Sequence, residues 1–384
     1  MITIENNNQP LRALIIAVNL NRNSYFDEDV AEGIALVESA GYQVLQVITM
    51  NRPKTDPSFF VGSGKVAEIK ALCAELTPDV LIFNHNISPV QERNLDQDLA
   101  IRIIDRTQLI LDIFASRVTS NEGILQIELA QQSYLATRLV RRWTHLERQR
   151  GGIGLRSGSG EKQIELDKRA IADKVVKLKS RLAQTAKQRD TQRKARLKSE
   201  LPMLSIVGYT NAGKSTLFNS LTKANVYAEN RLFATLQTTS RKLFITPEVE
   251  IILSDTVGFI RDLPHKLVAA FRATLEESIY ANLLVHVVDL ASSSKERQIE
   301  DVNLVLSEIE ADKIPQLIVY NKVDLLAEVV PHIVYDEIGE PQAVYLSAQH
   351  NLGLDLFRQA IIEKLEFINN QTSPQDLVYE PWKN

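Results

Sequence analysis

The chain has 384 residues, of which 44% are hydrophobic, and its 44 basic and 48 acidic residues leave a formal charge of −4. This length is too great for one ordinary domain, and it predicts two or three domains that each have a core. The sequence contains a single cysteine, Cys73, and no apolar run near the roughly 18 residues of a membrane span. These features argue against a disulfide-stabilised secreted protein and against a membrane-spanning one. We expect a cytoplasmic protein that acts as a monomer.

Positive charge is concentrated in one segment of this acidic chain. Between residues 141 and 200 there are 18 Lys and Arg against 7 Asp and Glu, an excess of 11, whereas the rest of the chain has 26 against 41. The segment is either a solvated helical face or a surface that binds a polyanion, and its composition leaves both interpretations open.

The first part of the chain, residues 1–118, alternates short β-rich runs with helical stretches. This alternation predicts a small parallel sheet flanked by helices. The run FVGSGK, Phe60–Lys65, opens one of the helices. Its glycines and the helix N-terminus are able to take an anion, and a helix-start turn explains them equally well. Whether ATP binds in this half of the chain stays open.

Residues 119–200 predict an antiparallel helical hairpin, because apolar residues recur at steps of three and four in two successive runs. The first run contains Leu125, Leu129, Ala136, Leu139, Trp143 and Leu146, and the second contains Ile164, Ile171, Val175, Leu178 and Leu182. The connection between the two helices is GGIGLRSGSGE, residues 151–161, with five glycines. We therefore expect a glycine-rich loop at the tip of a basic hairpin.

Strand and helix patterns resume after the hairpin and predict a second, larger α/β domain over residues 201–368, with a short tail at 369–384. Within it, GYTNAGKS follows an apolar strand, precedes a helix and matches the P-loop pattern. Backbone N–H groups from Asn211 to Ser215 are expected to wrap the phosphates, while Lys214 reaches the β and γ oxygens and Ser215 ligates Mg²⁺. Of the three glycine-rich runs, this one is predicted to hold phosphate.

Three further motifs follow in order at predicted strand ends. DTVG, Asp255–Gly258, is expected to hold Mg²⁺ through water at Asp255 and to meet the γ-phosphate with the Gly258 N–H. In NKVD, Asn321–Asp324, the final carboxylate accepts from two guanine donors that adenine lacks. Ser347 and Ala348 end the next strand, where a backbone N–H reaches the guanine O6. Together the four motifs predict a Ras-like P-loop GTPase domain that binds GTP and GDP.

The segment RLFATLQTTSRK must supply a threonine to Mg²⁺, and we favour Thr235, with Thr239 as the second choice. Phe259 occupies the place where many Ras-like proteins have a glutamine that orients the attacking water. An apolar side chain cannot do this, so we expect slow hydrolysis that depends on a partner. The predicted catalytic residues are Lys214, Thr235 and Gly258, and the predicted metal ligands are Ser215, Thr235 and Asp255.

The predicted GTP-binding residues form three groups along the chain. The first group is Gly208, Tyr209, Thr210, Asn211, Ala212, Gly213, Lys214, Ser215 and Thr216. The second group is Phe233, Ala234, Thr235, Leu236, Gln237, Asp255, Thr256, Val257 and Gly258. The third group is Asn321, Lys322, Val323, Asp324, Ser347, Ala348 and Gln349.

Over nearly its whole length, the sequence resembles the HflX-type GTPases of the Obg–HflX group of translation-associated G proteins. The resemblance rests on FVGSGK, DRTQLILDIFASR, EGILQIELAQQSYL, GGIGLR…GE and the G-domain motifs. It implies a factor that binds the large ribosomal subunit and its rRNA and separates stalled or idle ribosomes under stress. In this group, the LFATL pattern makes Thr235 the Mg²⁺ ligand. An assembly GTPase on immature large subunits, and an RNA-remodelling protein that acts without hydrolysis, remain alternatives.

On this resemblance, the glycine loop enters a narrow RNA-lined space, whereas the alternative is a simple flexible turn. The candidate RNA contacts are Gly151, Gly152, Gly154, Arg156, Gly158 and Gly160. The family usually has RGPGETQLE where this chain has RSGSGEKQIE, one residue longer and without proline. We therefore expect a more flexible tip. The region after the G domain is also short, which predicts fewer contacts there.

Overall fold

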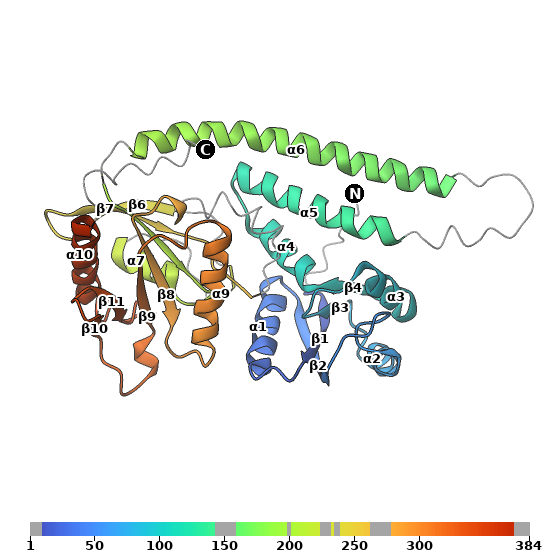
Figure 1. Cartoon of the computed structure of the whole chain (residues 1–384). Coiled ribbons are helices and arrows are strands. Elements are labelled where there is room, and N and C mark those ends of the chain that lie inside the picture. The colour runs from blue at the N-terminus through green and yellow to red at the C-terminus, as the bar shows by residue number, and fades with distance from the viewer. Residues whose placement is uncertain are drawn as a thin grey trace, which may run out of the picture. The chain divides into compact units, whose positions relative to one another are not determined.

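A computed structural model of the chain describes residues 10–142, 159–197, 201–222, 232–233, 239–261 and 278–371 (Figure 1). The chain divides into two compact units, Met1–Arg189 and Asp190–Asn384. Each unit has its own cluster of buried apolar side chains.

The N-terminal unit is built on a parallel sheet, which among the described residues has the strand order β2-β1-β3-β4. Its strands are β1 (Arg12–Leu20), β2 (Gln43–Arg52), β3 (Val80–Phe83) and β4 (Arg102–Asp105). Its connecting helices are α1 (Phe26–Ser39), α2 (Ser63–Leu76), α3 (Pro89–Leu99) and α4 (Arg106–Arg117). The central strands β1 and β3 are continuous buried apolar runs, as expected for a parallel sheet covered on both faces. The predicted N-terminal parallel α/β fold is confirmed.

The run FVGSGK forms the turn that begins helix α2. Gly62 is the N-cap residue with φ of +86°, and a Cβ there would lie 2.5 Å from the Arg52 guanidinium, so this position needs glycine. Lys65 pairs with Glu68 one turn later, with 2.6 Å between Nζ and Oε1. Because the lysine is engaged within its own helix, these contacts favour the helix-start interpretation of the run.

The helical middle region consists of α5 (Asn121–Arg142) and α6 (Ser159–Leu197), which run beside each other in opposite directions (Figure 1). Lys174 of α6 forms an ion pair with Glu128 of α5 at 2.7 Å. The apolar positions predicted from the spacing are half-buried where the structure describes their side chains. One of them, Leu178, is only 3% exposed. The spacing of apolar residues therefore identified positions of the two helices that are shielded from solvent.

Helix α5 also packs against the N-terminal sheet through a buried charged residue. Arg138, 7% exposed, forms ion pairs with Glu92 of α3 at 2.8 Å and with Asp105 at the end of β4. The Tyr134 hydroxyl donates to Asp105 at 2.7 Å, and the Tyr134 ring lies 4.7 Å from the Arg138 guanidinium carbon. The first arm of the hairpin is thus part of the N-terminal unit, and the boundaries at 118 and 200 remain predictions.

The C-terminal unit contains a larger sheet, whose described strands follow the order β10-β11-β9-β8-β5-β7-β6. The strands are β5 (Met203–Gly208), β6 (Thr239–Phe244), β7 (Glu250–Asp255), β8 (Leu283–Asp289), β9 (Gln316–Asn321), β10 (Ile333–Tyr335) and β11 (Pro341–Tyr345). The described helices are α7 (Lys214–Thr222), α9 (Lys295–Glu308) and α10 (Leu354–Gln371), with a short 3₁₀ turn η1 (Val323–Leu325). Pairing is parallel except for β6 and β10 at the two edges. This is the predicted P-loop GTPase fold.

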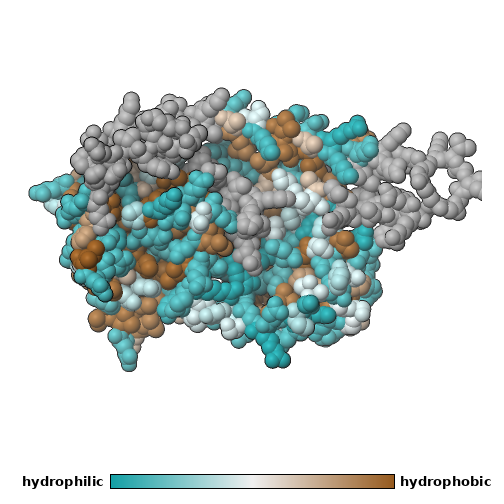
Figure 2. All heavy atoms as spheres, in the orientation of Figure 1, coloured by the Kyte–Doolittle hydropathy of each residue, from teal (hydrophilic) through white to brown (hydrophobic). Residues whose placement is uncertain are grey.

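On the face shown in Figure 2, hydrophilic and hydrophobic residues are interspersed over the described part of the chain. Exposed apolar residues include Val330 and Ile338, which flank the edge strand β10 and are 71% and 67% exposed. Within the part of the chain that the structure describes, no helix has the length and apolar character needed to cross a membrane.

Candidate nucleotide-binding site

The P-loop joins strand β5 to helix α7, and two of its glycines are required by close backbone approaches. Gly208 has φ of +146°, and a Cβ there would lie 2.2 Å from the Val287 carbonyl oxygen of β8. Gly213 has φ of +93°, and a Cβ there would lie 2.2 Å from the Asn321 side chain. Any larger residue would push the loop away from the neighbouring strands. The glycines therefore let the phosphate loop lie directly against β8 and the NKVD segment.

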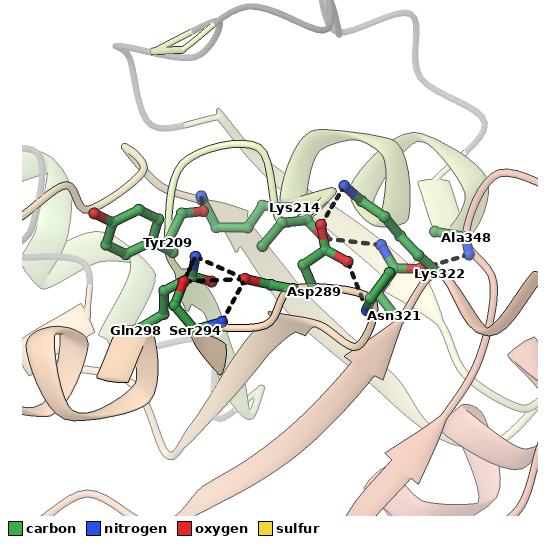
Figure 3. Close-up of polar contacts among 11 residues, drawn as sticks. Tyr209, Lys214, Asp289, Ser294, Gln298, Asn321, Lys322 and Ala348 are labelled. Atoms are coloured by element: carbon green, nitrogen blue, oxygen red, sulfur yellow. Dashed lines mark hydrogen bonds and ion pairs between the residues drawn. The ribbon is translucent and has the colours of Figure 1, made fainter. Parts of the chain in front are cut away.

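Lys214 is the first residue of α7 and is buried at the centre of this loop (Figure 3). Its Nζ donates to the Tyr209 carbonyl oxygen at 2.7 Å, so the ammonium is held inside the curve of the P-loop. Burial lowers the pKa of Lys214 from 10.5 to about 8, while the nearby Asp255 carboxylate opposes this shift. A phosphate bound in the loop would lie beside this ammonium and would stabilise its charged form, which burial disfavours.

The oxygen ligands that suit Mg²⁺ are brought together by α7 and β7. The Ser215 hydroxyl donates to Asp255 Oδ2 at 2.7 Å, and Asp255 is fully buried. Hydroxyl and carboxylate oxygens are the ligands Mg²⁺ prefers, so this pair fits that metal. Gly258 lies close by, since a Cβ there would come within 2.9 Å of Lys214 Nζ. The two phosphate motifs, far apart in the sequence, thus meet at one point.

The residues after Gly258 are attached to the P-loop by backbone hydrogen bonds. Thr210 N–H donates to the Phe259 carbonyl at 2.7 Å, and Phe259 N–H donates to the Gly208 carbonyl at 3.1 Å. The Arg261 N–H donates to the Tyr209 hydroxyl at 2.8 Å. The Phe259 side chain is 2% exposed. The residue in the place of a water-orienting glutamine is therefore apolar, buried and fixed to the phosphate loop.

The NKVD motif connects the P-loop to the loop after β11 (Figure 3). Asn321, 3% exposed, donates from Nδ2 to the Ala212 carbonyl and accepts at Oδ1 from the Ala348 N–H, both at 2.9 Å. The Asp324 side chain is 17% exposed and lies 3.7 Å from His350 Nε2. The P-loop, the NKVD motif and the segment of Ser347 and Ala348 are thereby held together around one buried amide.

Comparison with known proteins places this geometry in a family. Three family models match in succession: "GTP-binding GTPase N-terminal" at residues 27–115, "GTP-binding GTPase Middle Region" at 117–196 and "50S ribosome-binding GTPase" at 203–322. The GTPase HflX of Escherichia coli is 52% identical over 338 residues, which is 88% of this chain and 79% of that protein. The chain belongs to the HflX family of GTPases. It is accordingly a GTP-binding protein that hydrolyses GTP.

Other members of the HflX family and a solved structure agree with this assignment. The GTPase HflX of Magnetococcus marinus is 48% identical over 324 residues, covering 84% of this chain and 74% of that protein. The crystal structure of the SsGBP and GDP complex has a TM-score of 0.50 and 26% identity, and covers 94% of this chain and 99% of that one. The resemblance predicted from the sequence motifs is therefore confirmed.

Several of the predicted residues of this HflX-family chain lie outside the described part. They are Ala234, Thr235, Leu236 and Gln237 of the segment RLFATLQTTSRK, and Gly151, Gly152, Gly154, Arg156 and Gly158 of the predicted tip loop. Gly160 lies in the first turn of α6. Thr239 begins β6, opposite Asp255 of β7. The choice between Thr235 and Thr239 as the metal ligand remains a prediction.

Two polar neighbours of the nucleotide motifs were not found by sequence reasoning. Asp289, at the end of β8, forms an ion pair with Lys322, with 2.7 Å between Oδ2 and Nζ. His350 lies beside Asp324. Asp289 ends an apolar strand at the sheet edge where the other motifs lie, which was a usable signal. His350 stands two residues beyond Ala348 and matched no motif, so only the folded loop brings it to the site.

Proposed function

We propose that this GTPase associates with the large ribosomal subunit through its rRNA and splits stalled or idle ribosomes under stress, as a monomer in the cytoplasm. The observation that carries the proposal is the combination, in one HflX-family chain, of a GTPase domain and an antiparallel hairpin anchored on an N-terminal α/β unit. The family model that matches the G domain bears the description "50S ribosome-binding GTPase". A GTP-driven factor with an RNA-directed arm accounts for both parts.

The basic side chains of the hairpin support contact with RNA. Along the described part of α6, the exposed cations are Lys168, Arg169, Lys174, Lys177, Lys179 and Arg181. Lysine and arginine contacts to phosphate supply most of the salt-dependent affinity for nucleic acid. We assign the backbone and side-chain contacts at the tip to the glycine-rich loop, residues 151–160, with Arg156 as its cation.

The nucleotide chemistry of the proposal uses the residues of the P-loop and the DTVG motif. Lys214 binds the β- and γ-phosphate oxygens, and the Gly258 N–H meets the γ-phosphate. Ser215, Thr235 and, through water, Asp255 would hold Mg²⁺, which would neutralise charge on the phosphates. The adjacent Ser215 and Asp255 oxygens support this assignment.

Slow hydrolysis by the free protein is the second part of the proposal. Phe259 carries no polar group, and its backbone N–H and carbonyl already bond to the P-loop. A Ras-like site without its full catalytic set turns over at about 10⁻⁴–10⁻² per second. We therefore expect large subunits to accelerate hydrolysis. Steady-state rates that stay unchanged while co-sedimentation confirms binding would contradict this expectation.

The experiment that tests the function is a sucrose-gradient profile of purified ribosomes incubated with the protein. The arms contain GTP, a non-hydrolysable GTP analogue or no nucleotide, with Lys214→Met as the nucleotide-binding control. Splitting of ribosomes by wild type with nucleotide supports the proposal. Binding without splitting indicates an assembly GTPase, and effects that need no nucleotide indicate an RNA-remodelling protein.

A further inference from the structure

Asp289 lies outside the four nucleotide motifs, and an ion pair joins it to Lys322 of the NKVD segment. Asp289 is the last residue of β8 and Lys322 directly follows β9. Lys322 Nζ lies 2.7 Å from Asp289 Oδ2, and the two side chains are 26% and 22% exposed (Figure 3). Both groups are about three-quarters buried, so this pair is screened less by water than a surface pair.

The Asp289 carboxylate is itself fixed in place. Its Oδ1 accepts from the Ala291 N–H at 3.0 Å, and the intervening Leu290 N–H donates to the Asn321 carbonyl at 3.0 Å. The turn after β8 is therefore bonded both to Asp289 and to the residue that precedes Lys322. A carboxylate held at both oxygens is a rigid acceptor for the lysine.

The backbone of Lys322 is also constrained. Its φ is +70°, in the left-handed region that L-residues rarely adopt. Such a conformation persists only where surrounding contacts determine it, and it tends to occur at ligand-binding sites. Asn321, on one side of Lys322, is bonded to the P-loop, and Asp324 lies two residues further on. The ion pair thus fixes the position of the Lys322 side chain, in the middle of the predicted base-binding segment.

We propose that Asp289 is a positioning residue for guanine nucleotides, acting through Lys322. The proposal rests on the assignment of NKVD as the base-binding motif. The pair holds the four-carbon stem of Lys322 in one arrangement, so less rotamer freedom is lost when a base binds beside it. Because its ammonium is engaged by Asp289, Lys322 does not compete with the guanine donors for the Asp324 carboxylate. Without Asp289, Lys322 is free to pair with Asp324 and to compete with the guanine donors.

The test is titration calorimetry of GDP and GTP binding to full-length Asp289→Asn. Asparagine has the same shape and its oxygen still accepts from Ala291, but it removes the charge that holds Lys322. We expect Kd for both nucleotides to rise about five- to tenfold, with kcat unchanged, because the reacting phosphate lies at the other end of the nucleotide. Asp312→Asn, which makes the same charge change at an exposed position of the same domain, should leave Kd unchanged. Asp289→Glu should restore part of the affinity.

A double-mutant cycle with Lys322→Gln separates positioning from loss of structure. If Asp289 acts through the lysine, Asp289→Asn should cause little further loss in the Lys322→Gln background. A loss that persists undiminished in that background reports a loosened turn and overturns the proposal, as does a wild-type Kd for Asp289→Asn. If wild type shows no preference for guanine over adenine nucleotides, the base assignment itself fails, independently of Asp289.

Discussion

Asp324 is the residue on which base selectivity is predicted to depend. Its carboxylate is predicted to accept from two guanine donors, and it lies in a largely buried position, where an unpaired polar group costs about 1–3 kcal/mol. Asp324→Asn should weaken GTP binding roughly fivefold to more than a hundredfold. It should also favour xanthosine nucleotides, whose added oxygen suits an amide donor. Titration calorimetry with both nucleotides checks this, and an unchanged GTP affinity would show that Asp324 does not read the base.

The lowered pKa of Lys214 predicts that nucleotide binding depends on pH. Burial lowers the pKa of this lysine to about 8 in the free protein, and phosphate favours its charged form and raises that pKa again. Below pH 8 the ammonium is already present, whereas above pH 8 binding must take up a proton. GTP affinity should therefore fall as the pH rises from 8 to 9, by up to about tenfold per unit.

The measurement for Lys214 is calorimetry at pH 8.5 in two buffers with different ionisation enthalpies, because a difference in the observed binding enthalpy reveals proton uptake.

The lowered pKa of Lys214 also affects the stability of the free protein, and here the effect of pH has the opposite sign: stability rises with pH, whereas GTP affinity falls. The unfolded chain, with a lysine pKa of 10.5, binds more protons than the native state between pH 8 and 10.5. This group alone should make the free protein more stable as pH rises through that window. Binding without proton uptake would show that the pKa of Lys214 is not lowered in the free protein.

At the scale of elements, Arg138 joins helix α5 to the N-terminal sheet. Arg138→Met keeps the length of the side chain but leaves the Asp105 and Glu92 carboxylates without their cation, at a cost of about 3–5 kcal/mol. We expect a lower denaturation midpoint and faster amide exchange in α5. GTP binding should persist, because no nucleotide motif is touched.

The matched control for Arg138 is Arg169→Met on α6. Arg169 is 76% exposed and its pairing with Glu165 at 3.8 Å is a surface contact worth at most about 1 kcal/mol. Tyr134→Phe removes one hydrogen bond to the Asp105 carboxylate and should fall between the two, at about 1.5–3 kcal/mol. Equal midpoints for Arg138→Met and Arg169→Met would show that the buried cluster does not anchor the helix.

At the scale of the whole molecule, nucleotide chemistry and ribosome separation are predicted to reside in different parts of the chain. Deleting Arg156–Gly160 touches no phosphate motif, so intrinsic GTP hydrolysis should stay near normal. Ribosome binding should weaken only in part, because the basic side chains of the helices, which are proposed to contact phosphate, remain. Ribosome separation should fail. A gradient profile and a GTPase rate from the same preparation check this, and a deletion variant that splits ribosomes as well as wild type would reduce the loop to a simple turn.

The sequence by itself determined the fold class, the family and the GTPase activity. P-loop and NKVD residues are consecutive in the chain, and hydrophobic periodicity is a local signal, so both are visible without a structure. The half-buried positions Ile171, Val175 and Leu182 of α6 were likewise found from spacing alone. What such signals have in common is that the residues involved are neighbours along the chain.

Only the tertiary structure decided which distant side chains meet. Asp105, Tyr134 and Arg138 form one buried cluster, and Asp289 reaches Lys322, across separations of about thirty residues along the chain. The sequence suggested a separate hairpin, but the buried ion pairs join its first arm to the N-terminal sheet. A charged residue in a helical run is ordinarily a solvated one, and its burial depends on partners that only the packed chain supplies.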